Sequence, residues 1–310
     1  MVKAFTLNTN SEFFEENLNL TIGNFDGIHI GHQKIIHELI NLSKKKKYKS
    51  AILSFNPHPR EFFSKTNDKF NIITSSYKKS LFKNFGIDIY IDFKFDIHLS
   101  SLDPNQFIEK ILCEKLSIKN IIIGSDFKFG KDRKGDLLLL KDKALSNNFN
   151  VDVIDPVIDQ TTNNKYSSSF IRENIKKGLF EKVTKDLGRY WHMRGEVILG
   201  DQKASKINFP TANVIPGSHI HPLKGVYCVY ASINGKRYNA IANFGERPTL
   251  DGKKILLETH IFDFNDNIYG KELTVEFLTF IRKEQKFENF EKLTEQIKKD
   301  IKTAKSYHKI

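Results

Sequence analysis

The chain has 310 residues, of which 39% are hydrophobic and 12% aromatic. This is longer than one typical domain and apolar enough for two hydrophobic cores, so a disordered protein is excluded. The net charge of +12 is spread along the chain. Its one dense run, residues 44–47 with Lys49, lies where an amphipathic helix would end and complements the helix dipole, so a dedicated nucleic-acid-binding protein is disfavoured.

The first half of the chain alternates short β-type runs with helix-like stretches. The predicted strands are apolar and mostly β-branched or aromatic, at residues 18–22, 51–55, 87–93, 120–123 and 151–154. The predicted helices are residues 31–44, 75–85, 104–116 and 136–147. This alternation predicts a doubly wound parallel sheet, in which ligands bind beyond the carboxyl ends of the strands.

The pattern changes near residue 187, where short strands separated by turns begin. They are predicted at residues 195–199, 225–232, 238–244, 254–262 and 273–282. Asn234-Gly235 and Asp251-Gly252 are strong hairpin signals between them. The pattern predicts a small antiparallel barrel or sandwich. A helix follows, in which apolar residues step by three and four, namely Phe287, Phe290, Leu293, Ile297 and Ile301. We predict domains at residues 1–186 and 187–310.

Cysteine usage and hydropathy indicate the compartment. Cys113 and Cys228 lie more than a hundred positions apart, so a disulfide framework is not expected and a reducing cytoplasm fits best. The first ten residues are too polar for a signal peptide. No apolar run approaches the roughly 20 residues that cross a bilayer. We therefore expect a cytoplasmic protein with no membrane partner.

Residues 21–32 read Thr-Ile-Gly-Asn-Phe-Asp-Gly-Ile-His-Ile-Gly-His and run from a predicted strand into a helix. Glycines in this segment let the backbone approach a ligand closely, and the N–H groups of the helix start would receive a phosphate. His29 and His32 could donate hydrogen bonds to phosphate oxygens as charge builds up in a transition state. A metal-binding His pair and ordinary loop polarity remain alternatives, although no other ligand type stands at the usual spacing.

The segment as a whole resembles the nucleotidyltransferase superfamily, and residues 23–27 resemble the bacterial FAD synthetases. Three further stretches are similar to that family in the same order: residues 55–60, residues 124–130 with Arg133 and Gly135, and residues 167–172. The resemblance implies an α/β nucleotidyltransferase in which the FMN phosphate attacks the α-phosphorus of ATP in line and releases pyrophosphate. Positioning and Mg²⁺ would provide the catalysis without a protein nucleophile.

The resemblance also implies site residues. His29 and His32 are assigned to catalysis at the phosphates, and Arg172 is expected to clamp the triphosphate. The other implied contacts with substrate or nucleotide are Gly23, Asn24, Asp26, Gly31, Asp126 and Ser168. A class I aminoacyl-tRNA synthetase shares the His-Ile-Gly-His spelling, but the Lys-Met-Ser-Lys-Ser-type loop of those enzymes has no close match here.

Residues 209–213 read Phe-Pro-Thr-Ala-Asn. The hydroxyl of Thr211 and the side-chain carbonyl of Asn213 are hard ligands suited to Mg²⁺ bound to ATP, and an ordinary turn is the alternative. The flanking stretches resemble riboflavin kinases over nearly all of residues 187–305, at 187–190, 195–197, 224–227, 243–249, 257–264, 269–271 and 281–287. The resemblance implies a small antiparallel β-barrel domain with a C-terminal helix that phosphorylates riboflavin.

Glu258 lies in a predicted strand whose alternation puts it on the face opposite Leu257 and Thr259. By the resemblance it is assigned as the general base that takes the proton from the riboflavin 5′-hydroxyl. A surface carboxylate is the alternative. Pro210 and Arg247 are carried over as contacts with substrate or nucleotide.

Residues 204–208 depart from the family's Gly-Arg-x-Leu-Gly stretch and read Ala-Ser-Lys-Ile-Asn. The loss of two glycines and an arginine predicts weaker ATP binding, which Lys203 and Lys206 would offset in part. The leading hypothesis is a bifunctional enzyme that makes FMN and then FAD from riboflavin and ATP. An FMN adenylyltransferase with a degenerate kinase domain is the alternative, and the oligomeric state stays open.

Overall fold

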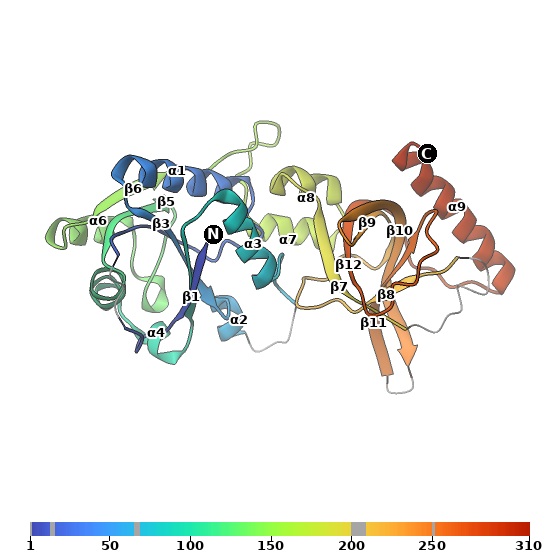
Figure 1. Cartoon of the computed structure of the whole chain (residues 1–310), viewed down its shortest axis with the longest axis horizontal. Coiled ribbons are helices and arrows are strands. Elements are labelled where there is room, and N and C mark those ends of the chain that lie inside the picture. Colours follow the sequence, from blue (N-terminus) through green and yellow to red (C-terminus); the bar gives the residue numbers. More distant parts are fainter. Residues whose placement is uncertain (1, 13–15, 65–68, 200–208, 250–251) are drawn as a thin grey trace. The chain divides into compact units, whose positions relative to one another are not determined.

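The computed structural model of the chain describes residues 2–12, 16–64, 69–199, 209–249 and 252–310. The chain forms two compact units, one of Met1–Asp68 and Ile73–Ser167 and the other of Lys69–Ile72 and Ser168–Ile310 (Figure 1). The domain boundary predicted after residue 186 stays a prediction, although residues 168–186 group with the second unit. The altered stretch 204–208 and Asp251 of the predicted turn lie outside the described residues.

The described strands of unit 1 form a parallel sheet in the order β1–β4–β3–β2–β5–β6. The strands are β1 Lys3–Leu7, β2 Leu18–Ile22, β3 Lys49–Asn56, β4 Ile89–Lys94, β5 Ile118–Gly124 and β6 Asn150–Ile154. The helices are α1 Ile30–Lys46, α2 Pro59–Phe63, α3 Ser75–Phe85, α4 Ile97–Ser101, α5 Pro104–Gln106, the π-helix η1 Phe107–Lys115, the 3₁₀-helix η2 Lys131–Arg133 and α6 Leu137–Ser146. The predicted doubly wound parallel sheet is confirmed.

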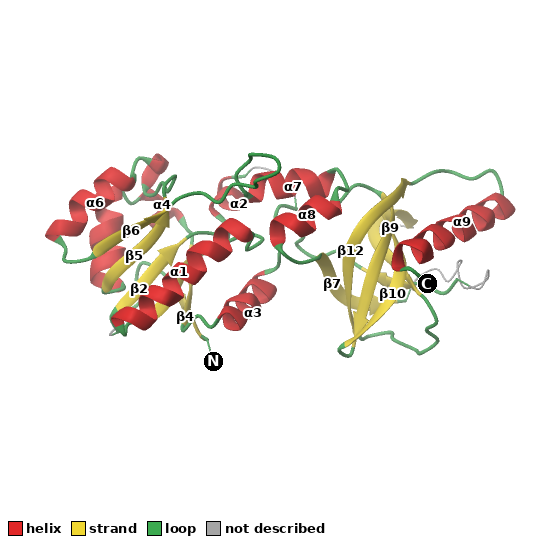
Figure 2. Ribbon diagram, turned by 90° about the horizontal axis from the view of Figure 1, so that it is seen from above, coloured by secondary structure: helices red, strands yellow, loops and turns green. Residues whose placement is uncertain are grey.

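Helices cover both faces of this sheet. On one face, alternate strand residues such as Leu20 and Leu53 form an apolar cluster that packs against Phe107 of η1. On the other face, α1 lies along β2, β3 and β5 (Figure 2) and buries Ile36 and Leu39 completely. Strands buried on both faces read as continuous apolar runs, which explains why the sequence predicts the central strands well.

A ladder of asparagines crosses three neighbouring strands of the sheet. Asn19 of β2 is opposite Asn120 of β5, which is opposite Asn150 of β6. The Asn120 side-chain amide donates to Asn19 Oδ1 (2.6 Å), its Oδ1 accepts from Asn150 (3.0 Å), and Asn19 Nδ2 donates to Ser43 Oγ of α1 (3.1 Å). Asn19 and Asn120 are 0% and 2% exposed. These amides are satisfied in one strand register, because a slip by one residue would turn them to the opposite face.

The described strands of unit 2 form a closed barrel in the order β10–β11–β8–β7–β12–β9, which confirms the predicted barrel. The strands are β7 Trp191–Ile198, β8 Ala212–Val214, β9 Gly225–Ile233, β10 Lys236–Thr249, β11 Gly252–Ile261 and β12 Glu272–Lys283. The helices of this unit are α7 Ser168–Lys176, α8 Phe180–Leu187 and α9 Phe290–His308. Helix α9 lies against β9, β10 and β12.

The core of unit 2 is built around Trp191, which is 1% exposed. Its ring stacks with Phe180 of α8 at a centroid distance of 5.4 Å and packs against Phe277 at 5.0 Å. The indole N–H donates to the Ile72 carbonyl (2.7 Å), so the segment Lys69–Ile72 belongs to this unit although it precedes most of unit 1 in sequence.

Some elements differ from the sequence predictions. Strands β1 and β8 were not predicted, because one is a short, partly exposed edge strand and the other has three residues. The single helix predicted over residues 104–116 is a short α-helix followed by the π-helix η1, which keeps a similar apolar stripe. No helix within the described ranges has the length and hydropathy needed to cross a membrane. Cys113 and Cys228 are free thiols.

The asparagine ladder yields a stability prediction. In Asn120→Ala, the buried Asn19 loses a hydrogen-bond donor and Asn150 loses an acceptor, which should cost roughly 1–3 kcal/mol. When urea unfolding is monitored by far-UV circular dichroism, the transition of unit 1 should occur at a lower urea concentration. The fluorescence of Trp191, the one tryptophan of the chain, reports unit 2 and should keep its midpoint. Asn105→Ala, at an exposed position of the same unit, is the control; equal midpoints for the two variants would contradict a structural role of the ladder.

Candidate active sites

The loop between β2 and α1 has an unusual backbone. Phe25, Gly27 and Ile28 have φ values of 47°, 89° and 43°. Phe25 and Ile28 are nevertheless 2% and 0% exposed, so buried side chains hold the loop in a conformation that residues other than glycine rarely adopt. The loop therefore has a fixed shape that depends on the residues packed beneath it.

His29 and His32 lie together at the amino end of α1. Nδ1 of His29 accepts a hydrogen bond from the His32 backbone N–H (3.3 Å) and caps the helix. The two rings are stacked, with centroids 3.7 Å apart. Because Nδ1 of His29 is an acceptor, its neutral ring carries the proton on Nε2, which is then a donor for a phosphate oxygen. The helix dipole adds positive potential at the same end.

Two predicted glycines leave space for ring side chains. A Cβ on Gly31 would lie 3.2 Å from Cε1 and Nδ1 of His29, and a Cβ on Gly23 would lie 3.1 Å from the Phe25 ring. Both distances are tighter than ordinary van der Waals contact, so a larger residue at either position would displace the neighbouring ring.

Sheet topology brings the second predicted loop next to the first. Strands β2 and β5 are parallel neighbours, and the chain continues from β2 to β3 on the other side. The loops after Ile22 and Gly124 thus leave the same edge at a topological switch point, the usual ligand position in such sheets. Asp126, in the second loop, forms an ion pair with Lys165. The hydrogen bond from Lys165 lowers the pKa of the Asp126 carboxyl.

Hydrogen bonds from neighbouring segments fix the positions of Asn24 and Asp26. The Asn24 carbonyl accepts hydrogen bonds from Lys78 Nζ (2.8 Å) and Ser54 Oγ (3.4 Å). Asp26 is 3% exposed and accepts from the Ile73 backbone N–H (3.3 Å). The side-chain oxygen of Asn24 is buried and has no hydrogen-bond partner among the described residues.

Ser168 and Arg172 lie on α7 in unit 2. Arg172 is 9% exposed, donates through Nε to the Phe70 carbonyl (3.0 Å) and has its guanidinium 3.6 Å from the Phe70 ring centroid. The roles of Ser168 and Arg172 at phosphates stay predictions.

A row of polar side chains crosses the outer face of the barrel in unit 2. Asn213 of β8 is directly opposite Glu258 of β11, which is directly opposite Asn243 of β10. Side chains of opposite residues stand on the same face of a sheet, about 5 Å apart. Leu257 and Thr259 are 0% exposed, so Glu258 faces away from the barrel interior as the alternation predicts.

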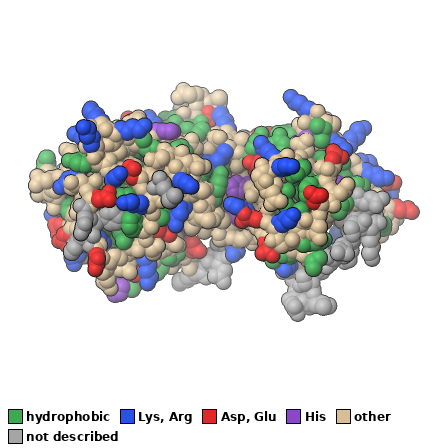
Figure 3. Space-filling view, in the orientation of Figure 1, with side chains coloured by type: hydrophobic (Ala, Val, Ile, Leu, Met, Phe, Trp, Pro, Cys, Tyr) green, Lys and Arg blue, Asp and Glu red, His purple; other side chains and the backbone are tan. Residues whose placement is uncertain are grey.

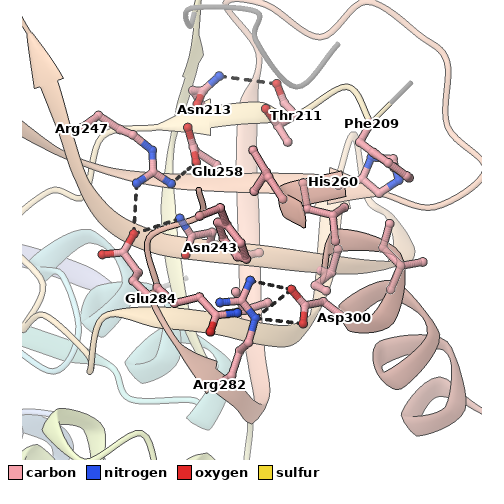
Figure 4. A pocket seen from close by; sticks show the side chains of 18 of the residues that line it. Phe209, Thr211, Asn213, Asn243, Arg247, Glu258, His260, Arg282, Glu284 and Asp300 are labelled. Atoms are coloured by element: carbon pink, nitrogen blue, oxygen red, sulfur yellow. Dashed lines mark hydrogen bonds and ion pairs between the residues drawn. The ribbon is translucent and has the colours of Figure 1, made fainter. Parts of the chain in front are cut away.

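This row lines a cavity of about 410 Å³ beside α9 (Figure 4). Its polar part contains Thr211, Asn213, Asn243, Arg247, Glu258 and Glu284. Its apolar part includes Phe287, Phe290, Leu293, Ile297 and Ile301, the residues of the predicted helical stripe. Their spacing predicts an amphipathic helix face and does not indicate that this face is part of a site. Periodicity alone does not distinguish an apolar face that packs on strands from one that borders a cavity.

Arg247 joins two carboxylates in this cavity. Nη2 forms an ion pair with Glu258 Oε2, and Nη1 lies 3.0 Å from Glu284 Oε1. Burial tends to lower the pKa of Arg247, but the hydrogen bonds and charges of Glu258 and Glu284 outweigh burial and raise it. The guanidinium therefore stays charged and orients Glu258 toward Asn213 and Thr211, as Figure 4 shows. Glu284 lies 37 positions from Arg247, and no sequence motif predicted its part in this site.

Thr211 borders two cavities. A second cavity, of about 170 Å³, contains Thr211, Thr259, Ile261 and Ile268. The Thr259 hydroxyl is buried, with no hydrogen-bond partner in the described part of the chain. The carbonyl of Pro210 accepts a hydrogen bond from His260 Nδ1 (2.8 Å) and so fixes the backbone before Thr211. The structure thus brings Pro210, Thr211, Asn213, Arg247 and Glu258 into one site.

Comparison with known proteins identifies both halves. A family model described as FAD synthetase matches residues 12–170, and one described as riboflavin kinase matches residues 187–308. A bifunctional riboflavin kinase/FMN adenylyltransferase of Haemophilus influenzae is 37% identical over 289 residues, which cover 93% of each chain. The Bacillus subtilis protein of that description is 34% identical over 293 residues, 93% of this chain and 92% of its own.

The chain belongs to this family. It is a transferase with an FAD synthetase domain and a riboflavin kinase domain, and both activities depend on ATP. The predicted two-activity enzyme is confirmed over the adenylyltransferase-only alternative. A solved structure described as a macrolide-efflux protein of Streptococcus pneumoniae has the same fold, with a TM-score of 0.85 and 28% identity over 97% of this chain and 98% of that chain.

The loop geometry around His29 yields a prediction for FAD synthesis. In Gly31→Ala, the new Cβ should displace the His29 ring, and a shift of that size at a reacting group can reduce the rate about 10²-fold. We expect conversion of FMN to FAD to fall while riboflavin phosphorylation by the same chain is retained. Gly217→Ala, where a Cβ meets no atom within 4 Å, should change neither rate. An unchanged FAD synthesis rate in Gly31→Ala would show that the ring has room to move.

Proposed function

We propose that Glu258 is the general base of riboflavin phosphorylation and that the large cavity holds riboflavin. The observation that carries this proposal is the register of Asn213 and Glu258 on β8 and β11, at a point where Thr211 borders both cavities. A flavin ring fits the apolar part beside α9, with its ribityl chain directed to the polar row. Glu258 then removes the proton of the 5′-hydroxyl as that oxygen attacks the γ-phosphorus of ATP.

The smaller cavity suits the nucleotide. Apolar side chains such as Ile261 and Ile268 can contact an adenine ring, and the buried Thr259 hydroxyl can form a hydrogen bond with it. Arg247 is held between Glu258 and Glu284 and orients Glu258. With ATP in the smaller cavity and its phosphates at Thr211, the positive charge of Arg247 lies beside those phosphates.

Mg²⁺ fits the oxygen donors at the kinase site. Thr211 and Asn213 offer a hydroxyl and an amide oxygen, and Asn213 is 6% exposed. No cluster of three or more His, Cys, Asp or Glu side chains suited to a metal occurs among the described residues. Two neutral oxygens with ATP phosphates and water are typical of Mg²⁺. When bound, the ion would neutralise charge on the transferred phosphoryl group.

For the second reaction, we propose that the amino end of α1, with His29 and His32, binds the ATP phosphates. Nε2 of His29 donates to an oxygen that gains charge as the FMN phosphate attacks the α-phosphorus and pyrophosphate leaves. Gly23, Asn24, Asp26 and Asp126 line the flavin side of this edge. We further propose a cytoplasmic enzyme without nucleic-acid partners. In Figure 3, Lys and Arg side chains on the visible face are interspersed with carboxylates.

Separate reactions with riboflavin or FMN, each with Mg-ATP and resolved by chromatography, test both sites. Glu258→Gln keeps the size of the side chain but removes the base, so FMN formation should fall about 10²–10⁴-fold. FAD formation from supplied FMN should be unchanged. Glu272→Gln, at an exposed carboxylate on β12, is the matched control. Full kinase activity in Glu258→Gln would assign the base to another residue.

A further inference from the structure

We propose that Lys78 is a positioning residue for FAD synthesis, which holds the loop before His29 in its active shape through the carbonyl of Asn24. The inference rests on the proposed roles of His29 and His32. It concerns a residue that contributes to the reaction through the loop and not by contact with the reacting atoms.

Helix α3 contacts this loop at two points. Lys78 Nζ donates to the Asn24 carbonyl at 2.8 Å. One turn later on the same face of the helix, the Phe82 ring packs edge-on against the Phe25 ring, with centroids 5.8 Å apart. Asn24 and Phe25 immediately precede the turn in which Gly27 and Ile28 have positive φ values. The polar and the apolar contact together therefore fix the start of the strained segment.

The surroundings of Lys78 act on its charge in opposite directions, and burial, which disfavours the ammonium form, has the larger effect. Burial lowers the pKa of Lys78, while the charges of Asp26 in the loop and Asp92 at the end of β4 act in the opposite direction. Tyr90 of β4 faces the same space, and burial raises the pKa of its phenol, which stays neutral. The ammonium thus connects the loop, through Asp26 and the Asn24 carbonyl, to β4 and α3.

A loop held in this way is sensitive to loss of the charge. Among the described residues, Ser54 Oγ also donates to the Asn24 carbonyl, and its 3.4 Å distance makes it the weaker donor. Without the ammonium, the peptide group between Asn24 and Phe25, where the positive φ values begin, loses the shorter of these two hydrogen bonds. Small displacements of a reacting geometry reduce rate more than binding, so the effect should appear mainly in kcat.

The first test compares Lys78→Met with Lys79→Met, its exposed neighbour on the same helix, in both reactions at neutral pH. For Lys78→Met we expect kcat for FMN to FAD to fall roughly 10–100-fold, with KM for ATP and FMN within about threefold. Riboflavin phosphorylation should stay at the wild-type rate in both variants. An unchanged kcat for FAD synthesis in Lys78→Met would overturn the proposal, as would an equal loss in Lys79→Met.

The second test is the pH profile. FAD synthesis by wild-type enzyme should be full while Lys78 is protonated and fall as pH rises through its lowered pKa, below 10.5. Lys78→Arg keeps its charge throughout, so this alkaline decline should be absent from its profile. Deprotonation of Lys78 would not itself unfold the protein, because a lysine with a lowered folded-state pKa contributes stability that increases with pH. The same decline in Lys78→Arg would overturn the proposal. An unchanged rate of FAD synthesis in His29→Ala would instead overturn the proposed role of the amino end of α1.

Discussion

Asn120 donates a hydrogen bond to the buried Asn19 and accepts one from Asn150, and these two contacts link β2, β5 and β6 in one register. The site that we propose for FAD synthesis depends on that register. Its two loops leave neighbouring strands at the same edge, so a slip of β5 against β2 would move Asp126 away from the His29 loop. The edge of the sheet where we propose this site is thus fixed by side-chain amides of the same strands.

The kinase site depends on register in a different way. Barrel closure leaves no free edge, and β8, with three residues, is held between β7 and β11. Asn213 and Glu258 lie opposite each other because the short pairing of β8 with β11 aligns them. Arg247 then orients the carboxylate, and Glu284 balances the second side of the guanidinium. In unit 1, side-chain amides of the sheet fix the strand register at the proposed site. In unit 2, closure of the barrel and the ion pairs of Arg247 with Glu258 and Glu284 have that role.

The sequence predicts those features that local pattern determines. Strand β2 was predicted with its observed bounds, and the motifs contained His29, Asn213 and Glu258, whose local environments the structure now describes. Lys78 was not predicted, because it lies 54 positions from Asn24 and nothing in the local sequence distinguishes it from the neighbouring Lys79. Lys165 and Glu284 were not predicted either, because their partners are also distant in the sequence. Long-range contacts between charged side chains produce no periodic pattern in the sequence. Buried apolar faces of helices and strands do produce one.

The contact between the Trp191 indole and the Ile72 carbonyl limits how the chain can be divided. Unit 2 contains Lys69–Ile72 as well as α7 and α8, and Phe180 of α8 stacks on the same tryptophan. A fragment cut at residue 187 would keep every proposed kinase residue but lose the acceptor of the indole N–H and the aromatic ring packed on it. The two activities can therefore be separated by point substitution more cleanly than by truncation, and evolution of a free-standing kinase from such a chain would need a replacement for that packing.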